Sequence, residues 1–112
     1  MKKLLIVWKS NHEVDVHNFV IPYTYNAKVQ EWFDHVELLI WGASQELVRD
    51  TPLIQERVKN LIKNEIPVYA CKMCARNTDA LEVLESIGVD VRFAGDLLSD
   101  ALKDPETEVL TI

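Results

Sequence analysis

The residues with the clearest potential for chemistry are the two cysteines of the chain, Cys71 and Cys74, in the stretch YACKMCARN. Thiols at this spacing can form a disulfide, share a metal with other ligands, carry sulfur as a persulfide, or fill small buried spaces. Lys72 and Arg76 flank the pair and would supply positive charge that favours a thiolate. The function of the chain depends on which of these uses applies.

A metal site is the least favoured use of the pair. Structural zinc takes about four ligands, and the chain has no second Cys-x-x-Cys pair and no closely spaced histidine pair. His12 is expected at the same end of the molecule as the cysteines, but His17 and His35 are not. We therefore predict no metal. We also predict no cofactor, because neither a GxGxxG nor a Walker pattern is present.

The remaining uses stay open at the level of the residues. A dithiol at a helix N-terminus has a lowered thiol pKa, yet the WCGPC-type surroundings of thioredoxin-like proteins are missing. A persulfide carrier needs a thiolate, partial exposure and a positive environment, all of which this stretch allows. Inert, buried cysteines are the third possibility.

Composition restricts the class of protein. The chain has 112 residues and a mass of 12.9 kDa, which predicts a single domain over residues 1–112. Its formal charge is −6, with 12 basic residues scattered among 18 acidic ones, so nucleic acids and anionic membranes are poor partners. No apolar run approaches the roughly 20 residues of a membrane span. The apolar run within the opening MKKLLIVWKS is too short to be the hydrophobic region of a signal peptide. We expect a cytoplasmic protein with reduced thiols.

The elements that position the cysteines follow from the alternation of short apolar runs with longer amphipathic ones. Continuous or alternating apolar runs predict five strands: Leu4–Trp8, Val36–Trp41, Ile66–Cys71, Val89–Phe93 and Glu108–Ile112. Helical periodicity between them predicts helical crossovers. The expected fold class is α/β, a three-layer α/β/α sandwich on a mostly parallel five-stranded sheet. The last two runs alternate more and are expected near the edges.

The helices are predicted from periodicity and from capping residues. One helix is expected over residues 13–33, although Pro22 must start, kink or interrupt it. Residues 44–48 are expected to form a single turn. A helix from Pro52 is expected to begin at Thr51 as N-cap and to end at a left-handed Asn64.

Two more helices are expected in the last third of the chain. Thr78 is expected to cap a helix that Gly88 closes. A short helix is expected over residues 96–103.

A site in such a sheet is expected beyond the carboxyl ends of the strands. Three of these ends carry polar or reactive residues, in KSNHE, GASQE and CKMCARN. Besides the cysteines and their flanking cations, the candidate pocket residues are Ser10, Asn11, His12, Gly42 and Ser44. The small residues after the second strand would bring backbone N–H groups near an anion, with Ser44 alternatively capping its turn.

Beyond these patterns, the sequence resembles the DsrE/DsrF-like (YchN-like) family of small sulfur-relay proteins along nearly its whole length. The resemblance lies in KKLLIVWKS, YNAKVQEWFDHVELLIWGAS, IPVYACKMCARNTDALEVLESIGVDV and the ending AGDLLSDALKD…EVLTI. It implies a flavodoxin-like domain that assembles into trimers or hexamers. In some members a cysteine after the third strand carries persulfide sulfur between a donor and an acceptor protein. That position corresponds to Cys71, and Cys74 belongs to the variant with a second cysteine.

The function predicted from residues and resemblance together is sulfur trafficking. Cys71 would be the persulfide carrier, Cys74 the resolving thiol or second acceptor, and Lys72 and Arg76 their electrostatic support. The alternatives are a non-catalytic oligomeric binding module with inert cysteines, or a Cys71–Cys74 redox switch. Aromatic residues of the first helix predict a homo-oligomer contact: Phe19, Tyr23, Tyr25 and Phe33.

Overall fold

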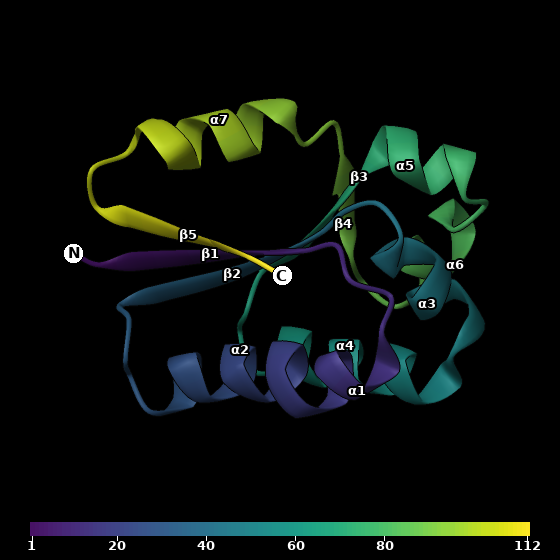
Figure 1. Cartoon of the computed structure of the whole chain (residues 1–112), viewed down its shortest axis with the longest axis horizontal. Coiled ribbons are helices and arrows are strands. Elements are labelled where there is room, and N and C mark those ends of the chain that lie inside the picture. Colours follow the sequence, from purple (N-terminus) through teal and green to yellow (C-terminus); the bar gives the residue numbers. More distant parts are fainter.

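The computed structural model describes residues 1–112, and its centre is a sheet of five parallel strands (Figure 1). The strands are β1 (Lys3–Trp8), β2 (His35–Ile40), β3 (Val68–Cys71), β4 (Asp90–Arg92) and β5 (Thr107–Thr111). Their order is β4-β3-β2-β1-β5, and all four pairings are parallel. The predicted α/β/α, flavodoxin-like class is confirmed, with an entirely rather than mostly parallel sheet. The two alternating strands lie at the edges, as predicted.

Helical segments connect the strands and cover both faces of the sheet. They are α1 (Glu13–Asp15), the π-helical turn η1 (Val16–Val20), α2 (Ile21–Val29), α3 (Ser44–Asp50), α4 (Pro52–Lys63), α5 (Lys72–Asn77), α6 (Leu81–Ser86) and α7 (Gly95–Lys103). Figure 1 shows α2 and α4 below the sheet and α7 above it. None of these helices has the length and apolar character needed to span a bilayer.

Side chains alternate along each strand, so each face of the sheet has its own buried core. The two cores differ in size. Leu4, Ile6 and Trp8 of β1 belong to a cluster of 21 buried residues on the side of α2, α4 and α6. Leu5 and Val7 belong to a cluster of five buried residues on the side of α7. The smaller core includes one of the two cysteines.

The first helical region differs from the single helix predicted over residues 13–33. It consists of α1, a π turn and α2, with Pro22 as the second residue of α2. Proline cannot donate a backbone hydrogen bond, and wider π turns accommodate such interruptions. The helix ends at Val29 because Glu31, with a φ of 56°, turns the backbone into the left-handed region.

The predicted N-cap position of Thr51 is confirmed, whereas the predicted roles of Asn64 and Thr78 were wrong. Thr51 is the N-cap residue of α4 by backbone position, but its side chain makes no capping hydrogen bond. Asn64 has a φ of −91°, and the left-handed residue is Glu65, with a φ of 64°. Thr78 is the C-cap of α5 and does not begin the following helix. Gly88, with a φ of 94°, follows α6 as predicted.

Candidate functional site

Both cysteines lie where β3 passes directly into α5. Cys71 is the last residue of β3 and Cys74 belongs to the first turn of α5. Only 6% of the Cys71 surface is exposed, because its side chain packs in the smaller core with Leu39 and Ala94. Cys74 is half-buried against the same cluster, and both thiols are free. Their predicted placement at the strand end is thus what the structure shows.

The surroundings of the Cys74 sulfur act on its acidity in opposite directions. Burial is the largest effect and raises the pKa of the thiol, and the neighbouring Cys71 thiol, within hydrogen-bonding reach, raises it further. Hydrogen bonds from the Gly42 backbone N–H and from the Trp41 side chain lower the pKa. The net pKa is higher than that of an ordinary cysteine. A tryptophan side chain can donate only through its indole N–H, and Trp41 packs against the same small cluster as Cys74, so the turn after β2 lies beside this thiol.

Gln45 fixes the relative position of the two strands that contribute these groups. It is fully buried, and its side-chain nitrogen donates to the backbone oxygens of Ile40 and Cys71, both at 3.1 Å. Its side-chain oxygen has no partner. The amide therefore ties the carboxyl end of β2 to that of β3, and with it the Trp41–Gly42 turn to the cysteines.

Ser44 has a comparable role between β1 and β2. Its buried hydroxyl donates to the backbone oxygen of Trp8 at 2.7 Å and to that of Trp41 at 3.2 Å. The predicted cap was wrong, since α3 has no side-chain capping bond and continues to Asp50 as a seven-residue helix instead of a single turn. Ser44 is a structural link at the strand ends.

Lys72 and Arg76 turn toward the carboxyl end of β4. The Lys72 Nζ lies 5.7 Å from the centre of the Phe93 ring, and the Arg76 guanidinium carbon lies 5.8 Å from it. These are cation–π distances. Neither cation is among the groups that shift the Cys74 pKa.

The candidate residues after β1 gather in a separate place. Ser10, Asn11 and Gly42 line an open depression together with Lys9, Ala43 and Ile112. Gly42 thus belongs both to this depression and to the Cys74 environment. Neither cysteine lines any of the five depressions of the surface.

His12 remains outside that depression. It is exposed and precedes α1, where its Nδ1 lies 3.9 Å from an Asp15 carboxylate oxygen. The structure therefore does not bring His12 together with the thiols.

Near the cysteines, successive helical connections of the sheet change from one of its faces to the other. Side chains of α2, α4 and α6 pack in the larger core, whereas those of α7, which follows β4, pack against the smaller one. Connections from the neighbouring strands β3 and β4 thus lead to opposite faces. In open parallel sheets ligands bind at such a switch point, and here Cys71 ends the first of the two strands.

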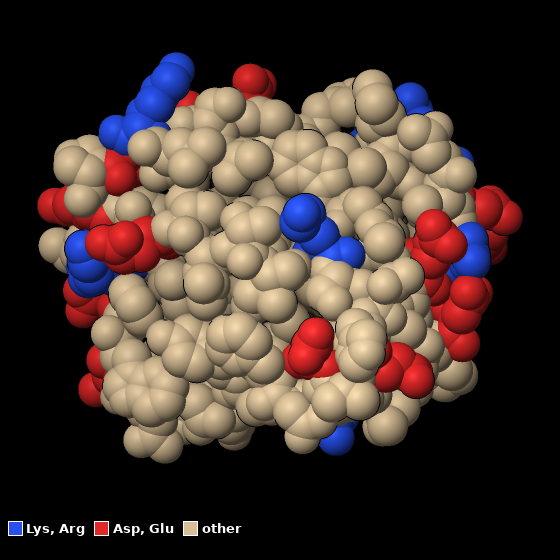
Figure 2. Space-filling view, in the orientation of Figure 1, with Lys and Arg blue, Asp and Glu red and all other residues tan.

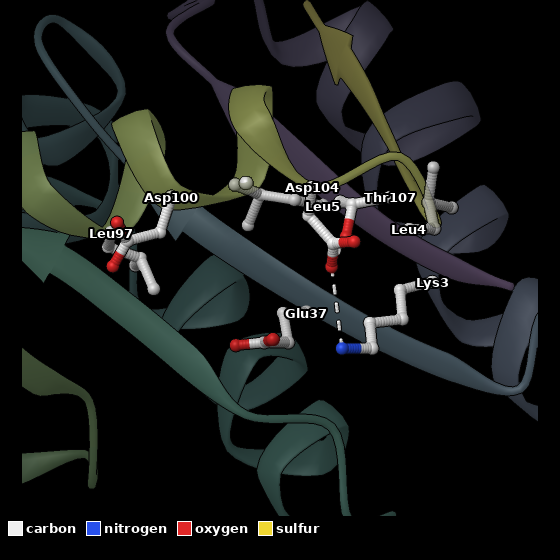
Figure 3. Close-up of a pocket in the computed structure, with 9 residues that line it drawn as sticks. Lys3, Leu4, Leu5, Glu37, Leu97, Asp100, Asp104 and Thr107 are labelled. Carbon is white, nitrogen blue, oxygen red and sulfur yellow. Dashed lines mark hydrogen bonds and ion pairs between the residues drawn. The ribbon is translucent and has the colours of Figure 1, made fainter. Parts of the chain in front are cut away.

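A second hollow lies at the opposite end of the sheet, between α7 and the first residues of β1 (Figure 3). Its volume is about 160 Å³, and its lining includes Lys3, Glu37, Asp100 and Asp104. The Lys3 Nζ donates to Asp104 at 3.4 Å, as the dashed line in Figure 3 marks. Glu37 accepts a hydrogen bond from Tyr69 and, with the burial of that phenol, raises its pKa. Lys3 and Asp104 thus pair with each other, and Glu37 pairs with His35, whose Nε2 lies 3.0 Å from a Glu37 carboxylate oxygen.

Sequence reasoning missed Trp41 and Gln45 as site residues. A tryptophan after an apolar run predicts packing, and its N–H matters only once the turn folds back over α5. Gln45 gave one usable signal, a long polar residue directly after a strand and a small-residue turn.

Comparisons with known proteins find solved structures with a similar fold. Neither a protein-family model nor a curated protein sequence matches the chain. The conserved protein BT1422 of unknown function from Bacteroides thetaiotaomicron is 30% identical, over 99% of this chain and 95% of its own, with a TM-score of 0.93. The YchN protein from Escherichia coli is 22% identical over the whole of both chains, with a TM-score of 0.72. This second similarity shows a shared fold.

Proposed function

We propose a sulfur-carrying function for this chain, which belongs to the same family as the conserved protein from Bacteroides thetaiotaomicron. Cys71 holds sulfane sulfur as a persulfide, and Cys74 is the second thiol of the site. The observation that carries the proposal is the pair of free thiols packed in one small cluster, at the point where the crossovers diverge. The YchN-like fold supports it, because the sequence resemblance to sulfur-relay proteins concerns the same fold.

The chemistry needs no cofactor. A thiolate attacks the outer sulfur of a donor persulfide, the S–S bond of the donor breaks, and the donor leaves as a thiolate. No net oxidation occurs, since the sulfane sulfur only changes its carrier. Burial of Cys71 suits the carrier because a shielded persulfide is protected from other thiols.

Intact-mass measurement on the native protein tests the proposal. After anaerobic incubation with glutathione persulfide we expect a gain of about 32 Da, the mass of one sulfur atom. The gain should be stable in the wild-type protein and shorter-lived in Cys71→Ser, where the sulfur can stay only on the less buried Cys74. Absence of any adduct on the wild-type protein would refute sulfur carrying.

A reversible dithiol switch is the second candidate, favoured by the same closeness of the two thiols. Oxidation would form a Cys71–Cys74 disulfide and remove two hydrogens, a loss of about 2 Da. A defined reduction potential together with no persulfide adduct would favour this function. If both thiols instead resist alkylation until the protein is denatured, they are inert and the chain is a binding module.

We also propose that the chain forms homo-oligomers and exchanges sulfur with donor and acceptor proteins. Phe19 and Trp32 are 43% and 55% exposed, and each ring lies against Tyr23, with centroids 5.8 and 5.7 Å apart. Figure 2 shows that charged side chains gather toward the two ends of the molecule and leave few between them, over β5 and α2. A surface with few charges and with exposed aromatic rings favours contact with another protein.

A further inference from the structure

We propose that sulfur enters and leaves the site through Cys74, and that the N–H groups of Trp41 and Gly42 hold this thiol as the port to the buried carrier Cys71. The inference rests on the proposed sulfur-carrying function and assigns separate roles to the two thiols. It also makes Trp41 a positioning residue of the site.

Accessibility is the first argument. Cys71 is 6% exposed, and no depression of the surface reaches it. In-line attack on a persulfide requires the attacking sulfur to approach along the S–S axis, so a protein-sized donor cannot reach Cys71 directly. Cys74 lies one helical turn further along the chain, is only half-buried, and packs against the same small cluster as Cys71. It is therefore the thiol that a donor meets first.

The pair of N–H donors is the second argument. Each transfer step creates or consumes negative charge on a sulfur, and N–H groups fixed in advance stabilise such charge without reorganising. Both donors come from the turn after β2, which the buried Gln45 amide ties to Cys71. Gly42 has a φ of 74°, the left-handed conformation that glycine adopts at no steric cost. Trp41 of this turn packs against the same small cluster as Cys74, so the turn lies beside the thiol, and we assign its two N–H groups to the Cys74 sulfur.

The steps balance without an added oxidant or reductant. The Cys74 thiol loses its proton to water, and its thiolate attacks the outer sulfur of the donor R–S–SH. This gives Cys74–S–SH and R–S⁻, which takes a proton from water. The Cys71 thiol then passes its proton to water, and its thiolate attacks the outer sulfur of Cys74–S–SH. The S–S bond of Cys74 breaks, giving Cys71–S–SH and returning Cys74 to a thiolate held by the two N–H groups. Delivery to an acceptor thiolate is the reverse sequence.

The order of labelling tests the port. Native protein is mixed with glutathione persulfide, quenched with an alkylating reagent under denaturing conditions at successive times, and digested with trypsin. Cleavage after Lys72 places Cys71 in NEIPVYACK and Cys74 in MCAR. We expect the persulfide on MCAR first and on NEIPVYACK later. In Cys71→Ser it should stay on MCAR, and in Cys74→Ser labelling of NEIPVYACK should slow at least tenfold.

The possible failures are distinct. No label on either peptide of the wild-type protein refutes the sulfur-carrying function itself. Label that reaches NEIPVYACK equally fast in Cys74→Ser and in the wild-type protein refutes only the port. Pulsed alkylation of the wild-type protein gives a check without mutation, because MCAR should be modified well before NEIPVYACK.

Trp41→Phe tests the indole N–H, since phenylalanine retains an aromatic ring but donates no hydrogen bond. We expect labelling of Cys74 at neutral pH to slow about fivefold, the effect of one net hydrogen bond, and its pH midpoint to move upward. Leu102→Ala shortens an exposed apolar side chain on α7 that contributes to neither the thiol site nor the aromatic surface, and it should leave both the rate and the pH midpoint unchanged. Identical pH profiles for the two variants would overturn the role of Trp41.

Discussion

Cys74 combines partial burial with two hydrogen-bond donors, and its reactivity follows from their balance. Burial disfavours the charged thiolate, and the donors compensate for only part of that cost, so the pKa stays above its usual value. The thiol is therefore mostly protonated near neutral pH. In the proposed sulfur transfer, a raised pKa would strengthen the Cys74 thiolate as a nucleophile and weaken it as a leaving group. Stabilisation of the leaving thiolate by the two N–H donors would offset the second effect.

The pH dependence of alkylation should show this balance. Alkylating reagents attack the thiolate, so the rate at Cys74 should increase with pH and reach half its maximum above the ordinary cysteine pKa of about 8.5. The measurement is the rate of MCAR modification by iodoacetamide across the pH range, with free glutathione as the reference. A midpoint below that of glutathione would contradict the expected direction.

Gln45 should matter for stability because its nitrogen serves two carbonyl oxygens at the strand ends. Gln45→Leu leaves these oxygens without that donor in a buried place, which we expect to cost about 2–3 kcal/mol of unfolding free energy. Urea denaturation measures the loss. Gln55→Leu is the matched control, since Gln55 also donates to two backbone oxygens but is only partly buried. An equal loss of unfolding free energy in both variants would show that burial of the Gln45 amide does not increase its contribution to stability.

At the scale of elements, the apolar runs predicted every strand because parallel strands covered on both faces require such runs. The caps were less predictable. Thr78 has the residue type of an N-cap, but α5 follows β3 without a loop, so Thr78 comes at the end of a helix. The π turn before Pro22 could not be predicted either, since its buried residues also fit an ordinary helical period.

The candidate site was predictable to the same extent. The sequence placed Cys71 and Cys74 at a strand end because the spacing of apolar runs sets where β3 stops. It did not show that the turn after β2 faces Cys74, since that contact joins segments about 30 residues apart in the chain. Tertiary contacts of this kind also decide that Lys72 and Arg76 lie on Phe93.

The left-handed residue after α4 gives a prediction at this scale. Glu65 has a φ of 64°, which costs a residue with a Cβ about 1 kcal/mol or more relative to glycine. Glu65→Gly should therefore raise the unfolding free energy by about 0.5–1 kcal/mol. Gly88→Ala is the reverse control, because an added Cβ would meet Ile62 at an ordinary 3.6 Å but would be strained at a φ of 94°. Denaturant titration should move the two variants in opposite directions.

At the scale of the whole molecule, the exposed aromatic surface predicts self-association. Trp32→Glu places a charge next to Tyr23 on this surface and should shift the protein toward the monomer in sedimentation velocity experiments. Leu102→Glu is the matched control, because Leu102 is 65% exposed on α7, away from the aromatic residues. A wild-type protein that sediments as a monomer at high concentration would refute the homo-oligomer, and an unchanged oligomer in Trp32→Glu would place its interface elsewhere.

Under the proposed sulfur-carrying function, the shortest strand should limit how long a sulfur remains on Cys71. β4 has three residues, pairs only with β3, and ends opposite Cys71, which lies in register with Arg92. Ala94, just beyond that edge, packs in the same cluster as Cys71. Short edge strands open locally at a lower free-energy cost than central ones. We therefore expect amide hydrogen exchange to be fastest in β4, and the storage lifetime of a persulfide on Cys71 to follow the opening rate of this one edge.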